Sequence, residues 1–417
     1  MTQERETETI NEAELRQRVR TLLSEIHPDD SQVDQITFRG AQYDHGLAWV
    51  HFPKGLGGLG LSRADQAFVD DELSLHAKNV ASDLDVNGIG IGMGAPTVLT
   101  FGTPEMHQRY LRPIFTGEEI WCQMFSEPGA GSDVAGLSSR GVREGDDWII
   151  NGQKVWTSLA HFSSFGMLLV RTDPTAPKHD GMSYFLLDMK APGVDIRPLH
   201  QITGEAEFNE IFFNDVRIPH SMMLGKEGAG WRVAVATLMN ERVALVGGRS
   251  SRGQGPISHL VETWKTRSKQ FGSTNIELAK KSIAQDKVLQ LYIEAEMLRI
   301  THERSKASMT DGVPGPEGSV GKLMSAELNM KIFEDTLDLM GNDALTYEPG
   351  YELRRPGDLH FEGESALKHA FLRSRANSIE GGTSEIMRNI LAERVLGLPG
   401  ETRVDKGIPW TDVPRSS

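Results

Sequence analysis

The stretch DWIINGQKVW, residues 147–156, indicates how the middle of the chain folds. It places an Asn-Gly pair between two runs of apolar and aromatic residues, which is a strong signal for a β-hairpin turn. The segments that follow are short and are bounded by Pro, Gly and Asp: GMLLV, MSYFLLDM, VDIRPL and FNEIFFNDVRIP. This spacing predicts a compact β-barrel or sandwich, which we assign to residues 121–227.

The segments on either side of this β region have helical periodicity. In residues 1–120, ELRQRVRTLLSEI and SRADQAFVDDELSLHA repeat apolar residues every three or four positions. In residues 228–399, longer segments such as IELAKKSIAQDKVLQLYIEAEMLRI carry apolar residues on one face. We therefore expect an N-terminal helical domain, a middle β domain and a C-terminal helical domain. A tail at residues 400–417 is expected to be partly disordered or to lie over a partner.

A glycine-rich segment, KGLGGLGL at residues 54–61, precedes one of the N-terminal helices. A phosphate cradle is one interpretation of this segment. Because no Lys-Ser/Thr pair of the Walker type follows, we prefer a turn that leads to a helix N-cap at Ser62.

The composition of the 417 residues restricts the classes of function. A net charge of −14 argues against a nucleic-acid partner, because phosphate binding needs clustered Lys and Arg. Cys122 is the only cysteine, which excludes an internal disulfide and a cysteine-based zinc site, and no metal is expected. The N-terminus lacks the apolar region of a secretory signal, and no run is long enough to cross a membrane, so we expect a cytoplasmic protein.

Four motifs, in this order along the chain, resemble the acyl-CoA dehydrogenase family: QMFSEPGAGSD (123–133), INGQKVWTS (150–158), FFNDVRIP (212–219) and GGTSEIMRNILAERVLG (381–397). The likeness runs from about residue 12 to residue 399. It implies the fold of that family: an N-terminal α-helical domain, a middle β-barrel domain and a C-terminal four-helix bundle. It also implies FAD as the cofactor.

Three of these motifs contain residues that the resemblance assigns to a flavin. From the residues alone, SEPGAGSD is a turn capped by Asp133, and a lone Trp at a strand end is usually a core residue. The resemblance implies instead that Ser126 bonds the flavin pyrimidine edge, that Trp156 packs against the flavin ring, and that Ser158 bonds flavin N5. The residues that it assigns to cofactor binding are Met124, Phe125, Ser126, Gly131, Ser132, Trp156, Thr157, Ser158, Thr383 and Glu385.

The stretch IEGGTSEIMR, residues 379–388, places a Glu near the position of the catalytic base in most of the family. That base directly precedes a Gly-Thr pair, and alignment on Gly382 and Thr383 puts Gly381 there instead of Glu380. A shift of one residue turns a side chain away from its intended direction, so Glu380 is not assumed to replace the base. The resemblance implies that the Gly381 N–H, with a flavin ribityl hydroxyl, forms an oxyanion hole for the thioester carbonyl.

A minority of the family carries the base on the helix after the β domain. The segment TLMNERVALVGG, residues 237–248, matches that helix and puts Glu241 at the base position. Three apolar residues share the helical face of Glu241, which predicts a desolvated carboxylate with a raised pKa: Leu238, Ala244 and Leu245. The alternatives are an exposed, charge-paired Glu241, Glu380 as the base, or no competent base.

The predicted reaction is the α,β-desaturation of an acyl-CoA thioester. Glu241 removes the α-proton, flavin N5 accepts the β-hydride, and an electron-transfer flavoprotein reoxidises the cofactor. Arg242 matches a family arginine that supports the active site, and substrate binding is assigned to Ser132, Met239 and Arg242. The alternatives are an acyl-CoA oxidase or nitroalkane-oxidase-like flavoenzyme, and a non-catalytic partner subunit.

Two departures from the family concern contacts to the FAD of a neighbouring subunit. In RSKQFG, the family Arg three residues before Phe271 is replaced by Ser268, with Arg267 displaced by one. In DLMGNDA, residues 338–344, Asp338 replaces a Gln, and a carboxylate repels a pyrophosphate. This pattern resembles the catalytic-Glu subunit of actinobacterial α2β2 acyl-CoA dehydrogenases that act on steroid side-chain thioesters. We expect a heterotetramer with a paralogous chain, and a homotetramer is the alternative.

Overall fold

The computed structural model describes residues 10–246, 251–308, 315–316, 318–347, 363–400 and 402–414, with side chains up to residue 240 in the first range. The chain divides into two compact units. The first comprises Met1–Leu199, Phe208–Ala244 and Val404–Ser417, and the second comprises His200–Glu207 and Leu245–Arg403. The domain boundaries near residues 120 and 227 remain proposals, since both fall inside the first unit.

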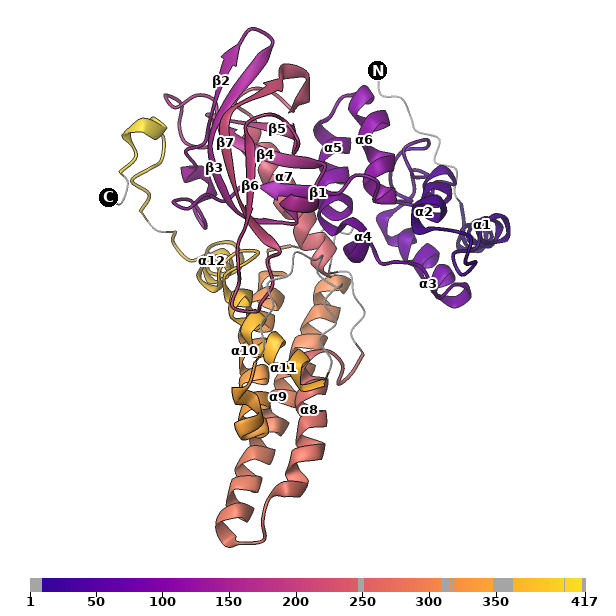
Figure 1. Ribbon diagram of the computed structural model, residues 1–417, viewed down its shortest axis with the longest axis vertical. Helices are drawn as coiled ribbons and strands as arrows, with labels where there is room; N and C mark the ends of the chain where they lie inside the picture. The colour runs from indigo at the N-terminus through magenta and orange to yellow at the C-terminus, as the bar shows by residue number, and fades with distance from the viewer. Residues whose placement is uncertain are drawn as a thin grey trace. The chain divides into compact units, whose positions relative to one another are not determined.

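The helical prediction for the N-terminal region is confirmed (Figure 1). The α-helices here are α1 (Glu12–Glu25), α2 (Gln35–Asp44), α3 (Gln66–His76), α4 (Asp83–Ile89), α5 (Ala95–Phe101) and α6 (Pro104–Thr116). The N-cap at Ser62 is also confirmed, because its side chain accepts from the N–H of Ala64 at 3.2 Å and Asp65 completes a capping box. Gly58 belongs to a turn in which a Cβ would lie 2.1 Å from the carbonyl oxygen of Phe52.

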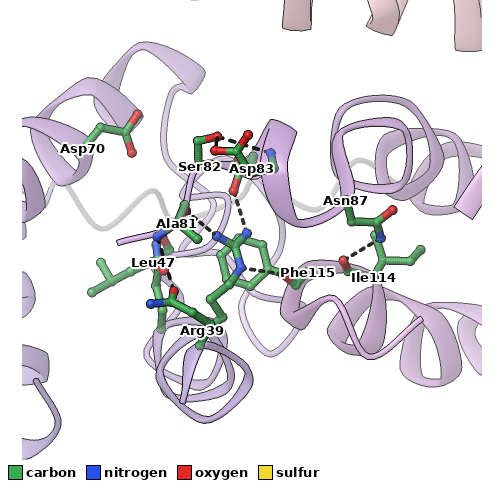
Figure 2. A network of polar contacts seen from close by, with 12 residues as sticks. Arg39, Leu47, Asp70, Ala81, Ser82, Asp83, Asn87, Ile114 and Phe115 are labelled. Carbon is green, nitrogen blue, oxygen red and sulfur yellow. Dashed lines mark hydrogen bonds and ion pairs between the residues drawn. The ribbon is translucent and has the colours of Figure 1, made fainter. Parts of the chain in front are cut away.

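A buried arginine fixes α2 against the end of α6 (Figure 2). Arg39 Nε donates to the carbonyl of Phe115 at 2.7 Å, and another nitrogen of its guanidinium lies 2.6 Å from the carboxylate of Asp83. Asn87 donates to the neighbouring carbonyl of Ile114 at 2.9 Å. Carbonyls in the last turn of a helix have no partner within the helix, so these side chains complete the end of α6.

The middle region folds into one eight-stranded mixed sheet. Its strands are β1 (Trp121–Met124), β2 (Arg140–Glu144), β3 (Asp147–Ser158), β4 (Phe165–Arg171), β5 (Met182–Asp188), β6 (Val194–Pro198), β7 (Phe208–Pro219) and β8 (Met223–Leu224). The pairing runs β6-β7-β3-β2-β4-β5-β8, and β1 pairs with β4 off this path. The small β domain is therefore confirmed as a mixed sheet, a coarser description than the barrel that the sequence predicted.

The predicted hairpin turn at Asn151 and Gly152 is wrong. Strand β3 continues through both residues, and the turn between β2 and β3 is instead at Gly145, which has a φ of 65°. Gly152 lies at a register shift against β7, and a Cβ on it would lie 2.3 Å from Ser139 Oγ. Asn151 Nδ2 donates to the carboxylate of Asp215 on β7 at 2.9 Å. The Asn-Gly pair thus serves a β-bulge and a close approach, not a turn.

Helix α7 (Gly230–Val246) follows the sheet and is anchored by a buried threonine. The hydroxyl oxygen of Thr237 lies 3.0 Å from that of Thr97 on α5 and 3.1 Å from the phenol oxygen of Tyr184 on β5. Gly230 allows α7 to begin against β5, because a Cβ there would lie 2.7 Å from the backbone carbon of Ser183. These contacts fix α7 one helical turn before position 241.

The helical prediction for the C-terminal region is confirmed within the second unit. Its α-helices are α8 (Pro256–Arg267), α9 (Asn275–Ala307), α10 (Gly318–Met340), α11 (Gly363–Ser374) and α12 (Ser384–Ile390), and α10 packs against the other four. Buried residues of α8, α9 and α10 form one apolar cluster that includes Leu260, Leu291 and Ile332. Within the described part of the chain, none of the helices combines the length and hydropathy needed to cross a bilayer.

Candidate active site

The loop that carries the SEPGAGSD motif is tied to β3 in the first unit. The backbone N–H of Val155 donates to the carbonyl of Ser126 at 2.9 Å. Glu127 is buried, and its carboxylate lies 2.8 Å from Nζ of Lys154, a fully buried residue of β3. The first cofactor motif is therefore held against the strand that carries the second.

The Glu127–Lys154 pair was not predicted, and it is stabilised by backbone donors. The N–H groups of Ser138 and Ser139 donate to Glu127 at 2.7 and 3.0 Å. Burial alone would raise the pKa of Glu127, but Lys154 and the serine donors together hold that pKa below its usual value. Burial lowers the pKa of Lys154, and Glu127 opposes this shift. The one available sequence signal is a Lys at an inward position of β3.

Trp156 lies where the regular pairing of β3 is interrupted. The register against β7 shifts between Lys154 and Thr157, and Trp156 has a φ of 62°. Its side chain is 61% exposed, with the ring of Phe208 at 6.0 Å in an edge-to-face arrangement. A positive φ is costly for an aromatic residue and persists mainly at functional sites. The interpretation of Trp156 as a core residue is therefore wrong, and its ring is available to a planar ligand.

Thr157 and Ser158 follow at the end of β3. Thr157 is buried, and among the described residues its hydroxyl oxygen has no hydrogen-bond partner, whereas Ser158 is half-buried. Asn209 Nδ2 donates to the carbonyl of Thr157 at 3.0 Å, and Asn209 Oδ1 lies 2.9 Å from His161 Nδ1. Burial lowers the pKa of His161, which favours a neutral imidazole next to Asn209. A buried hydroxyl without a partner is unusual, so a polar atom of a ligand is its natural partner.

The remaining predicted residues of this motif differ in accessibility. Met124 and Phe125 are both buried in the core, so neither side chain is exposed to a ligand. Gly131 and Ser132 are exposed. A Cβ on Gly131 would meet nothing within 4 Å, so the chain itself does not require a glycine there. A ligand that approaches the backbone closely would explain it.

Helix α7 carries the three remaining predicted residues of the first unit. Met239 is half-buried. Glu241 and Arg242 lie in the helical backbone of α7, and their side chains lie outside the described residues. Thr237 and Leu238, four and three residues before Glu241, pack inward, and residues at this spacing share a helical face.

In the second unit, Glu380 is engaged in a structural ion pair. Both carboxylate oxygens accept from the guanidinium of Arg373, at 3.0 and 2.8 Å, and Asn377 Nδ2 adds a third hydrogen bond at 2.9 Å. A bidentate pair of this kind is among the stronger side-chain contacts and fixes the direction of the carboxylate. The structure therefore gives Glu380 a role in holding the turn after α11.

The turn that contains Gly381 and Gly382 has a backbone suited to glycine, with φ values of 61° and 97°. Lys322 on α10 holds it in place, because its Nζ donates to the carbonyls of Asn377 at 2.8 Å and Gly382 at 2.6 Å. Lys322 was not predicted as a site residue. It ties together the residues before and after Gly381, because one carbonyl lies at Asn377 and the other at Gly382.

The hydroxyl residues after this turn begin α12. The Thr383 hydroxyl oxygen accepts from the N–H of Ile386 at 3.2 Å, so its proton remains available to donate to a ligand. Ser384 is buried, and its hydroxyl oxygen has no partner among the described residues. Glu385, a predicted cofactor residue, is exposed and lies 3.6 Å from Arg388.

The structure shows what surrounds the two residues that depart from the family pattern, Arg267 and Asp338. Arg267 is engaged within its own unit, because its guanidinium lies 2.6 Å from the carboxylate of Asp343 and 2.5 Å from that of Glu364. Asp338 is exposed on α10. The arginine near the family position is thus occupied, and the acid is on the surface.

Models of three domains match almost the whole chain in order. The N-terminal domain of acyl-CoA dehydrogenases matches residues 8–118, the middle domain matches residues 122–216, and the C-terminal domain matches residues 228–396. The chain belongs to the acyl-CoA dehydrogenase family. Members of this family are FAD-dependent oxidoreductases that act on CH–CH bonds.

The chain is similar in sequence to several mycobacterial acyl-CoA dehydrogenases. Acyl-CoA dehydrogenase IpdE1 of Mycobacterium tuberculosis is 39% identical over 363 residues, which cover 86% of each chain. Acyl-CoA dehydrogenase FadE34 of the same organism is 38% identical over 357 residues, but this chain spans only 45% of its length. Among solved structures, the ChsE4–ChsE5 complex from Mycobacterium tuberculosis is 27% identical with a TM-score of 0.68, over 95% of this chain and all of that one.

Each unit, taken by itself, contains described residues that fit part of an FAD molecule. In the first unit, the exposed Trp156 offers a ring to a planar group, the hydroxyl of Thr157 needs a partner, and Gly131 leaves its backbone accessible. In the second unit, the hydroxyls of Thr383 and Ser384 are available. Hydroxyls, exposed glycine backbone and an aromatic face are the groups that bind a flavin and its phosphates.

Proposed function

We propose that the protein is an FAD-dependent acyl-CoA dehydrogenase that introduces an α,β double bond into an acyl-CoA thioester. The observation that carries this proposal is Trp156, exposed at a β-bulge with a positive φ and followed by a buried hydroxyl without a partner. Bound FAD supplies the hydride acceptor of the reaction. In finer detail, we propose that the sheet is the β-barrel and α8 to α11 the four-helix bundle of the family.

Glu241 is the proposed base for the α-proton. The rival acid Glu380 already accepts from Arg373 and Asn377, which fix its carboxylate in place. Position 241 lies one turn after the buried Thr237, on a helix that several contacts anchor. The sequence pattern predicts that a carboxylate at this position is desolvated, and desolvation favours proton abstraction by raising the pKa.

The chain's other proposed contributions position the thioester. The N–H of Gly381 stabilises negative charge on the thioester carbonyl, and Lys322 holds the turn that orients it. Ser158 donates to the flavin, Ser132 contacts the pantetheine, and Met239 and Arg242 line the acyl side.

The test is a purified protein, with or without a partner chain, given a panel of straight, branched and steroid CoA thioesters under an artificial electron acceptor. We expect a yellow protein whose kcat/KM is highest for a bulky thioester, because Gly381 leaves the space that a Glu side chain would fill. A colourless protein without turnover on any thioester would contradict the proposal. Peroxide formation in stoichiometric yield would identify an oxidase instead.

The proposed assembly is an α2β2 heterotetramer with a paralogous acyl-CoA dehydrogenase chain. The engagement of Arg267 with Asp343 and Glu364 supports it, because this arginine is not available to a neighbour's cofactor. A row of exposed apolar residues along α9 is suited to a partner chain: Leu289, Ile293, Met297 and Ile300. The ChsE4–ChsE5 structure, a complex of two chains, supports the same proposal.

Restoring the family's Gln at position 338 tests the proposed heterotetramer. Asp338→Gln should increase FAD retention when the chain is expressed alone, because it removes an acid that repels a neighbour's pyrophosphate. Glu334→Gln, an exposed acid on the same helix, is the matched control and should have no effect. A wild-type chain that alone forms a stable tetramer with one FAD per chain would contradict the heteromer.

A further inference from the structure

The C-terminal tail binds to the β domain of its own unit. The backbone N–H of Trp410 donates to the carbonyl of Ala176 at 2.9 Å, and that of Thr411 donates to the carbonyl of Pro174 at 3.2 Å. Pro409 forms a β-bridge with Pro177. The tail was expected to be partly disordered or to lie over a partner. In the structure, Asp405 and residues 409–411 instead contact the loop between β4 and β5 of the same chain.

A buried arginine reinforces this docking. The guanidinium of Arg171 lies 4.7 Å from the ring centroid of Trp410, a cation–π contact. The same guanidinium donates to the carbonyl of Lys178 at 2.8 Å and to the carbonyl of Ala135 at 2.6 Å. Ala135 lies two residues after the SEPGAGSD loop. One side chain therefore contacts the tail, the β4–β5 loop and the region of the cofactor motif.

A buried lysine makes a second connection between the same elements. Lys178 is only 6% exposed, and its Nζ lies 3.1 and 3.0 Å from the carboxylate oxygens of Asp133, the last residue of the SEPGAGSD motif. It also forms an ion pair with Asp405 of the tail. The positive charge of a buried ammonium must be balanced by nearby carboxylates. If Asp405 is removed, Asp133 is the carboxylate that remains to balance the charge of Lys178.

The loop of the motif is thus held at both ends by buried lysines. Lys154 binds Glu127 at its beginning and belongs to β3, a strand in the interior of the sheet. Lys178 binds Asp133 at its end and is shared with the tail. Ser132 directly precedes Asp133, so the position of Ser132 depends on the contact that the tail completes.

We infer that residues 404–414 are a strap that positions the Ser132 loop through Lys178 and Arg171. The strap keeps the loop ready for the pantetheine part of an acyl-CoA, so this consequence rests on the proposed function. Asp405, Trp410 and Lys178 are positioning residues, and none of them needs to touch the substrate. Their loss should weaken thioester binding more than it slows the chemical step.

The test uses hydrogen exchange and steady-state kinetics on the holoprotein. Asp405→Asn and Trp410→Ala should speed amide exchange in peptides that cover residues 128–137, and should raise KM for acyl-CoA about 3- to 10-fold with kcat within about 2-fold. Asp133→Asn should speed exchange in the loop while the amides of Trp410 and Thr411 remain protected. Asp412→Asn, an exposed acid in the same tail, is the control and should change neither measurement.

The results distinguish a failure of the strap proposal from a failure of the proposed function. If Trp410→Ala frees the tail amides but exchange in residues 128–137 and KM are unchanged, the strap is wrong. If the wild-type protein turns over no acyl-CoA, the proposed function fails, and exchange alone still decides whether the tail holds the loop.

Discussion

Each of the two groups of site residues contains or adjoins an ion pair, and the two ion pairs differ in how deeply they are buried. The side chains of Lys154 and Glu127 are 0% and 5% exposed at a separation of 2.8 Å, whereas those of Arg373 and Glu380 are 31% and 38% exposed at the same separation. Equal distances therefore have unequal consequences. Loss of one partner leaves a charge in the interior in the first pair, but water can replace the partner in the second.

The two pairs also show that an acid close to a family motif need not be the catalytic base. Glu127 belongs to one family motif and Glu380 directly precedes another, and each holds the nearby backbone through a cation. Neither carboxylate is free to take a proton from a substrate without giving up its partner. The acid proposed for that step, Glu241, lies instead on α7.

The largest effect is expected for Lys154→Met. Removing the ammonium leaves Glu127 buried and without its cation, which should cost about 3–5 kcal/mol in the free energy of unfolding, together with loss of bound FAD. Urea unfolding and flavin absorbance measure the two effects. Lys190→Met, at an exposed position of the same domain, is the control.

A double variant sharpens the same prediction. Replacing Glu127 by Leu in the Lys154→Met background should recover much of the lost stability, because no charge then remains buried. A cost below about 1 kcal/mol for Lys154→Met alone would show that the buried pair does not hold the loop.

The next effect is a loss of stability in acid that depends on Glu127. The folded-state pKa of Glu127 lies below its usual value of 4.5, so the pair contributes stability above that pH and loses it as the pH falls through the folded-state pKa. Unfolding followed between neutral pH and pH 3 should show this loss in the wild type. In Glu127→Gln, stability should be lower at neutral pH and should depend less on pH in that window. Parallel curves for the two proteins would disprove the linkage.

A smaller change, and an increase in stability instead of a loss, is expected for a substitution at Trp156. Trp156→Gly should relieve the strain of a positive φ and raise the stability of the apoprotein by up to about 1 kcal/mol, while FAD affinity falls. Trp156→Phe keeps the strain and part of the ring, so it should retain more FAD without a gain in stability. An apoprotein destabilised by Trp156→Gly would mean that the tryptophan serves packing.

The smallest effect is expected for Glu380→Gln. Because the pair with Arg373 is partly exposed, its loss should cost no more than about 1 kcal/mol of stability. Thermal unfolding compared with Glu385→Gln, an exposed acid in the next helix, measures the difference. A cost as large as that of Lys154→Met would remove the contrast between the two pairs.

The sequence predicted those parts of the molecule that follow from local periodicity. The helices of both units and the N-cap at Ser62 were expected from spacing and capping chemistry, and the order of the motifs indicated the family. The Asn151-Gly152 hairpin was wrong, because glycine there accommodates Ser139 across the sheet. Local sequence does not distinguish a turn from such a close approach.

Contacts between distant segments account for most of what was missed. Lys154 carries one local signal, its inward position on the strand, but its burial depends on Glu127, which is far from it in sequence. The same is true of Lys322, and of Lys178 between Asp133 and the tail. An isolated charged residue carries no local signal that its partner lies in another segment of the chain.

The most direct test of the account is bleaching of the flavin by substrate under anaerobic conditions in Glu241→Gln and Glu380→Gln. The account predicts that Glu241→Gln binds the thioester but leaves the flavin oxidised, with a loss of at least about 1,000-fold in the reduction rate. Glu380→Gln should bleach within a few-fold of the wild type. Rapid bleaching in Glu241→Gln together with its loss in Glu380→Gln would contradict the central claim.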